Sequence, residues 1–200
     1  MCGGTIAIKP NDDFQGESNR NVIIGNTCVY GANGGKLFAS GRAGERLAVR
    51  NSGCKVVVEG AGDHCCEYMT DGRVVVLGGV GRNLGAGMTG GLAYIMDESP
   101  DFDKRVSKDV NFYRITSEEA QAELYALIQW HAFITDSEIA RKIIRDFDKY
   151  LPKFWQIVPP SEEQKDVPAL QKEEKKDYTL ESTPSKTKTL DRNYFDKVLN

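Results

Sequence analysis

The chain has no long apolar run, no large excess of one charge and no glycine beyond residue 91. A helix that crosses a membrane needs about 20 consecutive, mostly apolar residues, and no stretch of this sequence approaches that length. The first residues, MCGGTIAIKPNDD, also lack the basic and then apolar layout of a signal peptide. We therefore expect a soluble, intracellular chain that has no membrane partner.

Charge and cysteine content exclude two further classes of protein. The 26 basic and 29 acidic residues leave a net charge of -3, so no broad basic field is available to attract a nucleic-acid backbone. Cysteines are few for a disulfide scaffold, odd in number and unevenly spaced. We expect no nucleic-acid partner and five reduced thiols, at Cys2, Cys28, Cys54, Cys65 and Cys66.

All 20 glycines lie between residues 3 and 91, and many of them recur with a fixed period. Four turn-type pairs each end in a glycine 19 residues after the previous one, and these glycines are Gly34, Gly53, Gly72 and Gly91. Glycine is favoured where a backbone turns tightly or approaches another backbone closely. A corner that recurs at this interval predicts a coiled repeat with few helices before residue 97.

Short β-prone segments lie between these corners in the same register. One column consists of residues 37–39, 56–58, 75–77 and 94–96, and a second of residues 27–30, 46–49 and 65–68. Units of this size cannot enclose a core alone, but they bury one when they stack. We predict a mainly β chain that forms a right-handed parallel β-helix, or β-solenoid, of about four 19-residue coils with two open ends. The first coil, over residues 16–34, fits this register less well.

Two helices are predicted after the repeats. Thr116 and Glu119 match a capping box, and apolar residues follow at helical spacing, so we expect a helix from about Ser117 to Phe133. A second helix should begin after Thr135 and stop before Pro152. Because all of residues 56–58 are apolar although strand side chains alternate between faces, the sheet needs cover on its outer side. We expect this helical pair to pack there or on a neighbouring domain.

These patterns divide the chain into three parts. Residues 1–97 are predicted to form the Gly-rich β-helix domain, and residues 98–158 the helical segment. From Pro159 the composition changes to Lys, Glu, Asp, Ser, Thr and Pro with few large apolar residues. Residues 159–200 are therefore predicted to be a charged linker or tail that is partly disordered.

The glycines after the strand-like run at residues 74–77 also allow a dinucleotide-binding interpretation. A Gly-rich turn after a strand can bring a pyrophosphate close to the backbone. However, Leu84 stands where a third glycine is expected, and the Gly-rich residues 85–91 are a poor start for a helix. A nucleotide-binding oxidoreductase domain that uses the loop from Gly78 to Gly85 stays as an alternative.

His64, Cys65, Cys66 and Glu67 form a run of possible metal ligands. Successive residues of a strand point to opposite faces, so the four side chains cannot all reach one ion. We expect buried thiols in the core instead.

Two other residues could carry chemistry. His131 lies on the apolar stripe of its helix, where a packed, hydrogen-bonded histidine is expected rather than a catalytic one. Cys2 could become an N-terminal nucleophile after loss of Met1, but that chemistry needs a surrounding active-site domain. We assign no catalytic, cofactor-binding or metal-binding residue.

Long ordered strings of this sequence resemble the repeat region of glutamate synthase. They are residues 41–46, 49–53, 60–72, 74–78 and 83–91, and the stretch from His131 to Phe154 is similar to the helical segment that follows the repeats in that family. The resemblance covers residues 3–158. It implies the Gly-rich β-helix (GXGXG) domain near the C-terminus of the large subunit.

Glutamate synthase makes glutamate from glutamine and 2-oxoglutarate with electrons from reduced pyridine nucleotide or ferredoxin. The resemblance implies that amidotransferase and flavin-binding domains share the polypeptide, with FMN and a 3Fe-4S cluster there and FAD in a possible reductase portion, in the cytoplasm or a plastid. None of the corresponding motifs occurs here, so we expect a structural, non-catalytic interdomain module without a cofactor of its own. A β-solenoid that self-associates through its open ends is the other alternative.

Overall fold

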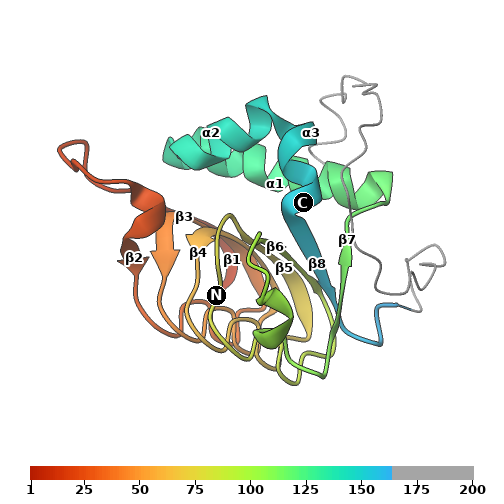
Figure 1. Ribbon diagram of the computed structural model, residues 1–200. Coiled ribbons are helices and arrows are strands. Elements are labelled where there is room, and N and C mark those ends of the chain that lie inside the picture. Colours follow the sequence, from red (N-terminus) through yellow and green to blue (C-terminus); the bar gives the residue numbers. More distant parts are fainter. Residues whose placement is uncertain (164–200) are drawn as a thin grey trace.

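The computed structural model of the chain describes residues 1–163. Most of the predicted linker over residues 159–200 therefore lies outside the described residues. The described part has two layers, a stack of β coils and a group of helices above one face of that stack (Figure 1).

All eight strands belong to one sheet in the order β1-β3-β4-β5-β6-β8-β7, with β2 paired to β3. The pairs from β1 to β6 are parallel, whereas β8 pairs antiparallel with both β6 and β7. The strands are β1 (Cys2–Ile8), β2 (Val22–Ile24), β3 (Gly34–Ala43), β4 (Ser52–Gly60), β5 (Asp71–Val76), β6 (Leu92–Met96), β7 (Asn111–Arg114) and β8 (Phe154–Val158).

Each parallel strand forms one side of a coil, and turns close the coil before the next strand. Leu37 on β3 pairs with Val56 on β4, and Val75 on β5 pairs with Tyr94 on β6. The two partners in each of these pairs are separated by one predicted period of the sequence. The predicted β-solenoid of about four coils with a 19-residue period is thus confirmed.

The period is interrupted twice in the middle of the stack: Arg42 of β3 pairs with Gly60 of β4, one position short of the period, and a second shift lies between β4 and β5. We expected Val56 beside Val75, but Val56 pairs with Val74, one position short of the period. The separation between paired residues of β4 and β5 is 19 at Ser52 and 18 from Lys55 onward. β4 therefore contains one extra residue, a β-bulge. The glycine spacing does not reveal this bulge, because Gly53 lies within it, between Ser52 and Lys55, and keeps its 19-residue spacing to Gly72.

The first coil is much longer than the others. It begins at β1 rather than at residue 16, and Cys2 of β1 pairs with Gly34 of β3, well over one period away in the sequence. The additional residues, about 9–21, leave the stack as an insertion that contains the short helix η1 (Ser18–Arg20).

The second predicted β column is not a strand. Its residues form turns in which φ is positive at three positions per coil, with values between 53° and 71°. Non-glycine residues adopt this backbone only at a cost, and hydrogen bonds between coils stabilise it. Ala48, Cys66 and Gly85 each donate the backbone N–H to a carbonyl of the preceding coil, at 3.0, 2.8 and 2.9 Å. The sets are Thr27, Val29 and Gly31; Arg46, Ala48 and Arg50; His64, Cys66 and Tyr68; Asn83, Gly85 and Gly87.

The two ends of the stack differ, although we expected both to be open. At coil 4, Leu84 bridges to Val106, and Phe102 of η2 (Phe102–Lys104) and Val110 join the interior apolar cluster. Strands β8 and β7 then extend the sheet. In contrast, β1 at the other end is exposed along almost its whole length.

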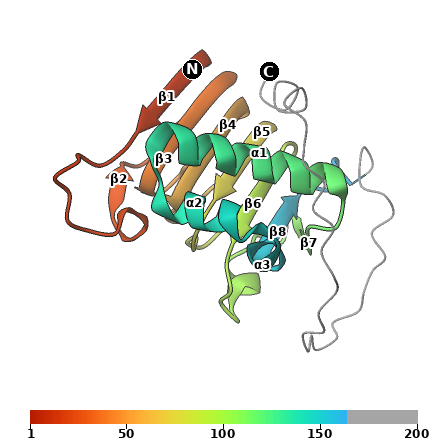
Figure 2. The same ribbon diagram turned by 90° about the horizontal axis from the view of Figure 1, so that it is seen from above.

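The helices cover the outer face of the sheet, and α1 lies across β3 to β6 (Figure 2). Both major helices are capped by serines rather than by the predicted threonines. The hydroxyls of Ser117 and Ser137 each accept the backbone N–H three residues on at 3.2 Å, and Asp136 (φ 57°) makes the corner between the helices. The helices are α1 (Glu118–Thr135), α2 (Glu138–Arg145), α3 (Phe147–Tyr150) and η3 (Leu151–Lys153).

Apolar clusters lie on both faces of the sheet. Val56 and Val58 point into the solenoid interior, and Val57 packs among α1 residues such as Leu124 and Leu127. The wholly apolar triplet at residues 56–58 is therefore explained by cover on both faces, as expected.

Candidate functional site

One ionisable side chain lies buried between the two layers. Glu59 of β4 is 1% exposed, and it follows Val57 at the two-residue spacing that keeps strand side chains on one face. It therefore projects from the solenoid toward the helices. A charge in such a place is tolerated only with close polar partners.

Three serine hydroxyls from three different elements donate to Glu59. Ser40 of β3 reaches Oε1 at 3.0 Å, Ser18 of η1 reaches Oε2 at 2.7 Å, and Ser137 at the start of α2 reaches Oε1 at 2.5 Å. The carboxylate thus joins the neighbouring coil, the insertion and the helical layer at a single point.

His131 of α1 is the fourth neighbour of this carboxylate. Its Nε2 lies 3.6 Å from Oε1 of Glu59, with both side chains fully buried, and its ring stacks on Phe38 at 6.2 Å between centroids. A separation of 3.6 Å is too long for a hydrogen bond, and neither ring nitrogen has such a partner within residues 1–163. The histidine is packed as expected, but the hydrogen bond we expected is absent there.

The pKa shifts define the charges of the site. Burial alone raises the pKa of Glu59, but the contact with His131 and the hydroxyls of Ser137 and Ser18 outweigh it and lower that pKa below 4.5. Burial lowers the pKa of His131 from 6.5, against the opposing effect of Glu59. At neutral pH the site holds an ionised carboxylate beside a neutral imidazole.

This arrangement suits attachment rather than nucleophilic catalysis. In a Ser-His-acid triad the imidazole lies between the hydroxyl and the acid and accepts the hydroxyl proton. Here the hydroxyls of Ser18, Ser40 and Ser137 donate directly to Glu59. Their protons are engaged by the carboxylate, and His131 accepts none of them.

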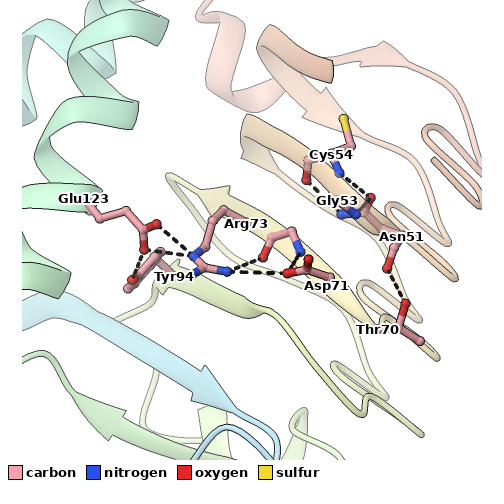
Figure 3. A network of polar contacts seen from close by, with 9 residues as sticks. Asn51, Gly53, Cys54, Thr70, Asp71, Arg73, Tyr94 and Glu123 are labelled. Carbon is pink, nitrogen blue, oxygen red and sulfur yellow. Dashed lines mark hydrogen bonds and ion pairs between the residues drawn. The ribbon is translucent and has the colours of Figure 1, made fainter. Parts of the chain in front are cut away.

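A second polar tie joins the same two layers near the other end of α1 (Figure 3). Arg73 of β5 donates through Nε to both carboxylate oxygens of Glu123 on α1, at 2.8 and 3.0 Å, and the buried Tyr94 of β6 donates its hydroxyl to Oε2 at 2.7 Å. These contacts hold α1 over β5 and β6.

Within the solenoid, Asn51 braces the corner before β4. Its side-chain Oδ1 accepts the N–H of Cys54 and its Nδ2 donates to the carbonyl of Cys54, both at 2.9 Å (Figure 3). A buried amide satisfied on both sides fixes the backbone at the point where the bulge of β4 begins.

A column of glycines marks close contact between coils. A Cβ on Gly62 would lie 2.9 Å from the backbone nitrogen of Glu45 in the preceding coil, and a Cβ on Gly81 would lie 2.5 Å from that of Asp63. Neither position has room for a methyl group. These glycines serve close stacking, in agreement with the geometric role predicted for the repeat.

The run of possible metal ligands divides between two sides of one turn. Cys65 and Cys66 are both buried with their sulfurs 3.6 Å apart, while His64 and Glu67 pair outside at 3.7 Å. The thiols are buried as expected, but they point the same way because the segment is a turn with alternating φ rather than a strand. Three converging ligands are the minimum for an iron–sulfur or zinc centre, and residues 1–163 contain no such group.

The loop from Gly78 to Gly85 belongs to the stack. Gly78 lies against the carbonyl of Glu59, where a Cβ would come within 2.6 Å, and Leu84 is fully buried. Turns follow Arg82, and no helix starts in residues 78–101. The helix N-terminus that a pyrophosphate needs is therefore absent from this segment.

Comparison with known proteins agrees with this geometry. A family model described as the GXGXG motif matches residues 1–160, and ferredoxin-dependent glutamate synthase 2 of Synechocystis sp. is 54% identical over 169 residues, 84% of this chain. This chain is a GXGXG domain of the glutamate synthase family. The spinach chloroplastic enzyme of that name is 53% identical over 82% of the chain, and Arabidopsis thaliana ferredoxin-dependent glutamate synthase 2 is 51% identical over 92%.

This GXGXG domain spans only about a tenth of the length of those relatives, 10% to 11%. The relatives therefore contain far more polypeptide than the residues compared. None of the helices within residues 1–163 is long and apolar enough to cross a membrane.

Sequence reasoning missed the Glu59 site. One signal was available, because Glu59 and Ser40 are the polar residues that continue the apolar triplets of two neighbouring coils at the 19-residue spacing. Ser18 and Ser137 could not be added, since their approach depends on the path of the insertion and on the helix corner.

Proposed function

We propose that this GXGXG domain is a structural, non-catalytic interdomain module of a glutamate synthase, the enzyme that makes glutamate from glutamine and 2-oxoglutarate with reducing equivalents. The observation that carries the proposal is the use of Glu59, whose hydrogen bonds tie three elements together and engage the hydroxyl protons of Ser18, Ser40 and Ser137. The ion pair of Arg73 with Glu123 has the same attaching role.

Partners of the module are, in this proposal, the amidotransferase and flavin-binding domains of the same polypeptide, with a reductase portion where one exists. FMN, the 3Fe-4S cluster and FAD would reside in those parts, and the ferredoxin dependence named for the relatives would apply to this chain too. The compartment would be the cytoplasm or a plastid, because the spinach and Arabidopsis relatives are named chloroplastic.

The open end at β1 is the surface we propose for docking to those domains. Its edge is exposed, and Ile6 on it is 46% exposed. An uncovered strand edge favours further strand pairing. In the Synechocystis relative the matched residues are 11% of the polypeptide, so most of that polypeptide lies outside this module.

The test compares the isolated chain with the complete enzyme. The purified chain should bind no FMN in a fluorescence titration and hydrolyse no glutamine. In a full-length glutamate synthase that carries this segment, Glu59→Leu should lower the thermal midpoint while each folded molecule retains its glutaminase rate. Flavin binding by the isolated chain, or activity lost at unchanged stability, would refute the structural role. Dimerisation of the isolated chain through β1 would support the self-associating alternative.

A further inference from the structure

The insertion in the first coil lines an open cavity of about 400 Å³ beside the Glu59 site. Insertions in repeat proteins map to loops on one face, which is often the binding face. Phe14, Val22 and Ile23 supply most of the apolar lining, and Ser18 and Ser40 line the part next to Glu59. The other lining residues are Pro10, Asn11, Asp13 and Asn21. The cavity combines an apolar wall with a small polar patch.

The polar patch presents acceptors. A serine hydroxyl has one proton and two lone pairs, and Ser18 and Ser40 direct their protons to the carboxylate of Glu59. What each hydroxyl can offer a ligand is therefore a lone pair. Such a patch selects a hydrogen-bond donor.

The charge behind the patch favours a cation. Glu59 is ionised, and no lysine or arginine of residues 1–163 forms an ion pair with it. Lys9 pairs instead with Asp136, and Arg20 pairs with Glu17. A buried carboxylate without a cationic partner makes the adjacent cavity electrostatically negative.

We propose that this cavity binds a small alkylammonium compound, with the ammonium group on the hydroxyl oxygens of Ser18 and Ser40 and the alkyl chain against Phe14, Val22 and Ile23. An alkylammonium matches both surfaces, since its three donors meet acceptors and its stem meets apolar side chains. This binding activity is separate from the structural role proposed above, so either can fail alone.

The test titrates the full chain with n-butylammonium chloride and follows backbone amides by NMR. Amides of residues 10–23 and 40 should shift and saturate with a roughly millimolar dissociation constant. Neutral n-butanol and anionic butyrate carry a comparable apolar stem without the ammonium, and neither should saturate in that range. Equal binding of butanol, or shifts confined to other acidic surfaces, would overturn the proposal.

Two substitutions locate the site. Val22→Trp should fill the cavity and abolish saturation without unfolding, because Val22 is 65% exposed, and Tyr30→Trp, outside the cavity, is its matched control. Ser40→Ala should weaken binding about fivefold, the effect of one hydrogen bond. Unchanged affinity in Val22→Trp would refute the site even if Ser40→Ala fails to fold.

Discussion

The hydroxyl of Ser137 makes two bonds at once: it accepts the N–H of Ala140 at the start of α2 and donates to Glu59 of β4. The cap of a helix is thereby also its attachment to the solenoid. A helix N-terminus carries partial positive charge. The ionised carboxylate of Glu59 therefore also attracts this end of α2. The stability of α2 and its placement are therefore coupled through one atom.

Replacing this serine should cost more than replacing an ordinary cap. Ser117→Ala removes only the cap of α1, a loss of about 1 kcal/mol. Ser137→Ala removes a cap and also a donor to a buried charge, and should cost about 2 to 4 kcal/mol in all. Urea unfolding of the two variants measures the difference. Equal losses would mean that the bond to Glu59 adds nothing.

Stability should fall in two steps as the pH is lowered. The lowered pKa of His131 means that the unfolded chain takes up a proton near pH 6.5 that the folded chain refuses, so stability drops as the pH falls below 6.5. The pKa of Glu59 is lower in the folded chain than in the unfolded chain. The stability that this difference provides is present above about pH 4.5 and is lost as the pH falls through the pKa of Glu59 in the folded chain. Unfolding free energies at pH 7.5, 5.5 and 4 would record both steps.

Variants separate these steps. His131→Leu should remove most of the loss between pH 7.5 and 5.5, and it should also shrink the loss below 4.5, because the contact with His131 helps to lower the pKa of Glu59. Glu59→Gln should reduce the lower step. A His131→Leu protein whose pH profile matches the parent chain would show that another group controls the upper step.

Reactivity of the cysteines should follow burial. Cys2 is exposed, whereas burial raises the pKa of Cys54 to about 11, and the neighbouring Cys65 thiol together with burial raises that of Cys66. Since the thiolate is the reactive form, iodoacetamide at pH 8 should modify Cys2 in the folded chain and spare Cys54 and Cys66 until urea is added. Mass spectrometry of peptides reads the sites, and alkylation of Cys66 at the rate of Cys2 would contradict the packing.

The stack was predictable because glycine spacing reports backbone corners directly. The turns of the second column were not, since Leu47 and Cys65 are apolar and β-prone, and only hydrogen bonds between coils impose positive φ on their neighbours. Strands β7 and β8 were missed for a related reason. Each is four or five residues long and forms only by pairing with the end of the stack.

The candidate site was harder to foresee than the fold. Glu59 is a single acid after an apolar run, and it acquires its role from partners 19, 41 and 78 residues away. Only the first of these separations follows from the repeat. The other two depend on how an irregular insertion and a helix corner fold back over β4.

Two glycines of one triplet offer the sharpest test of coil stacking. In Gly79-Val80-Gly81, a Cβ on Gly81 would lie 2.5 Å from the backbone of Asp63, whereas the nearest atoms to a Cβ on Gly79 are 3.8 Å away. Gly81→Ala must push two coils apart and should destabilise the chain by about 1 to 3 kcal/mol.

Gly79→Ala is the matched control, because it changes the same residue type two positions earlier and should stay within about 0.5 kcal/mol. Neither glycine has the positive φ that alone would penalise alanine, so the comparison isolates contact between coils. Thermal or urea unfolding of both variants decides it. Equal stability of the two would mean that the coils can separate freely at Gly81, and the explanation of this glycine column as a stacking contact would then be wrong.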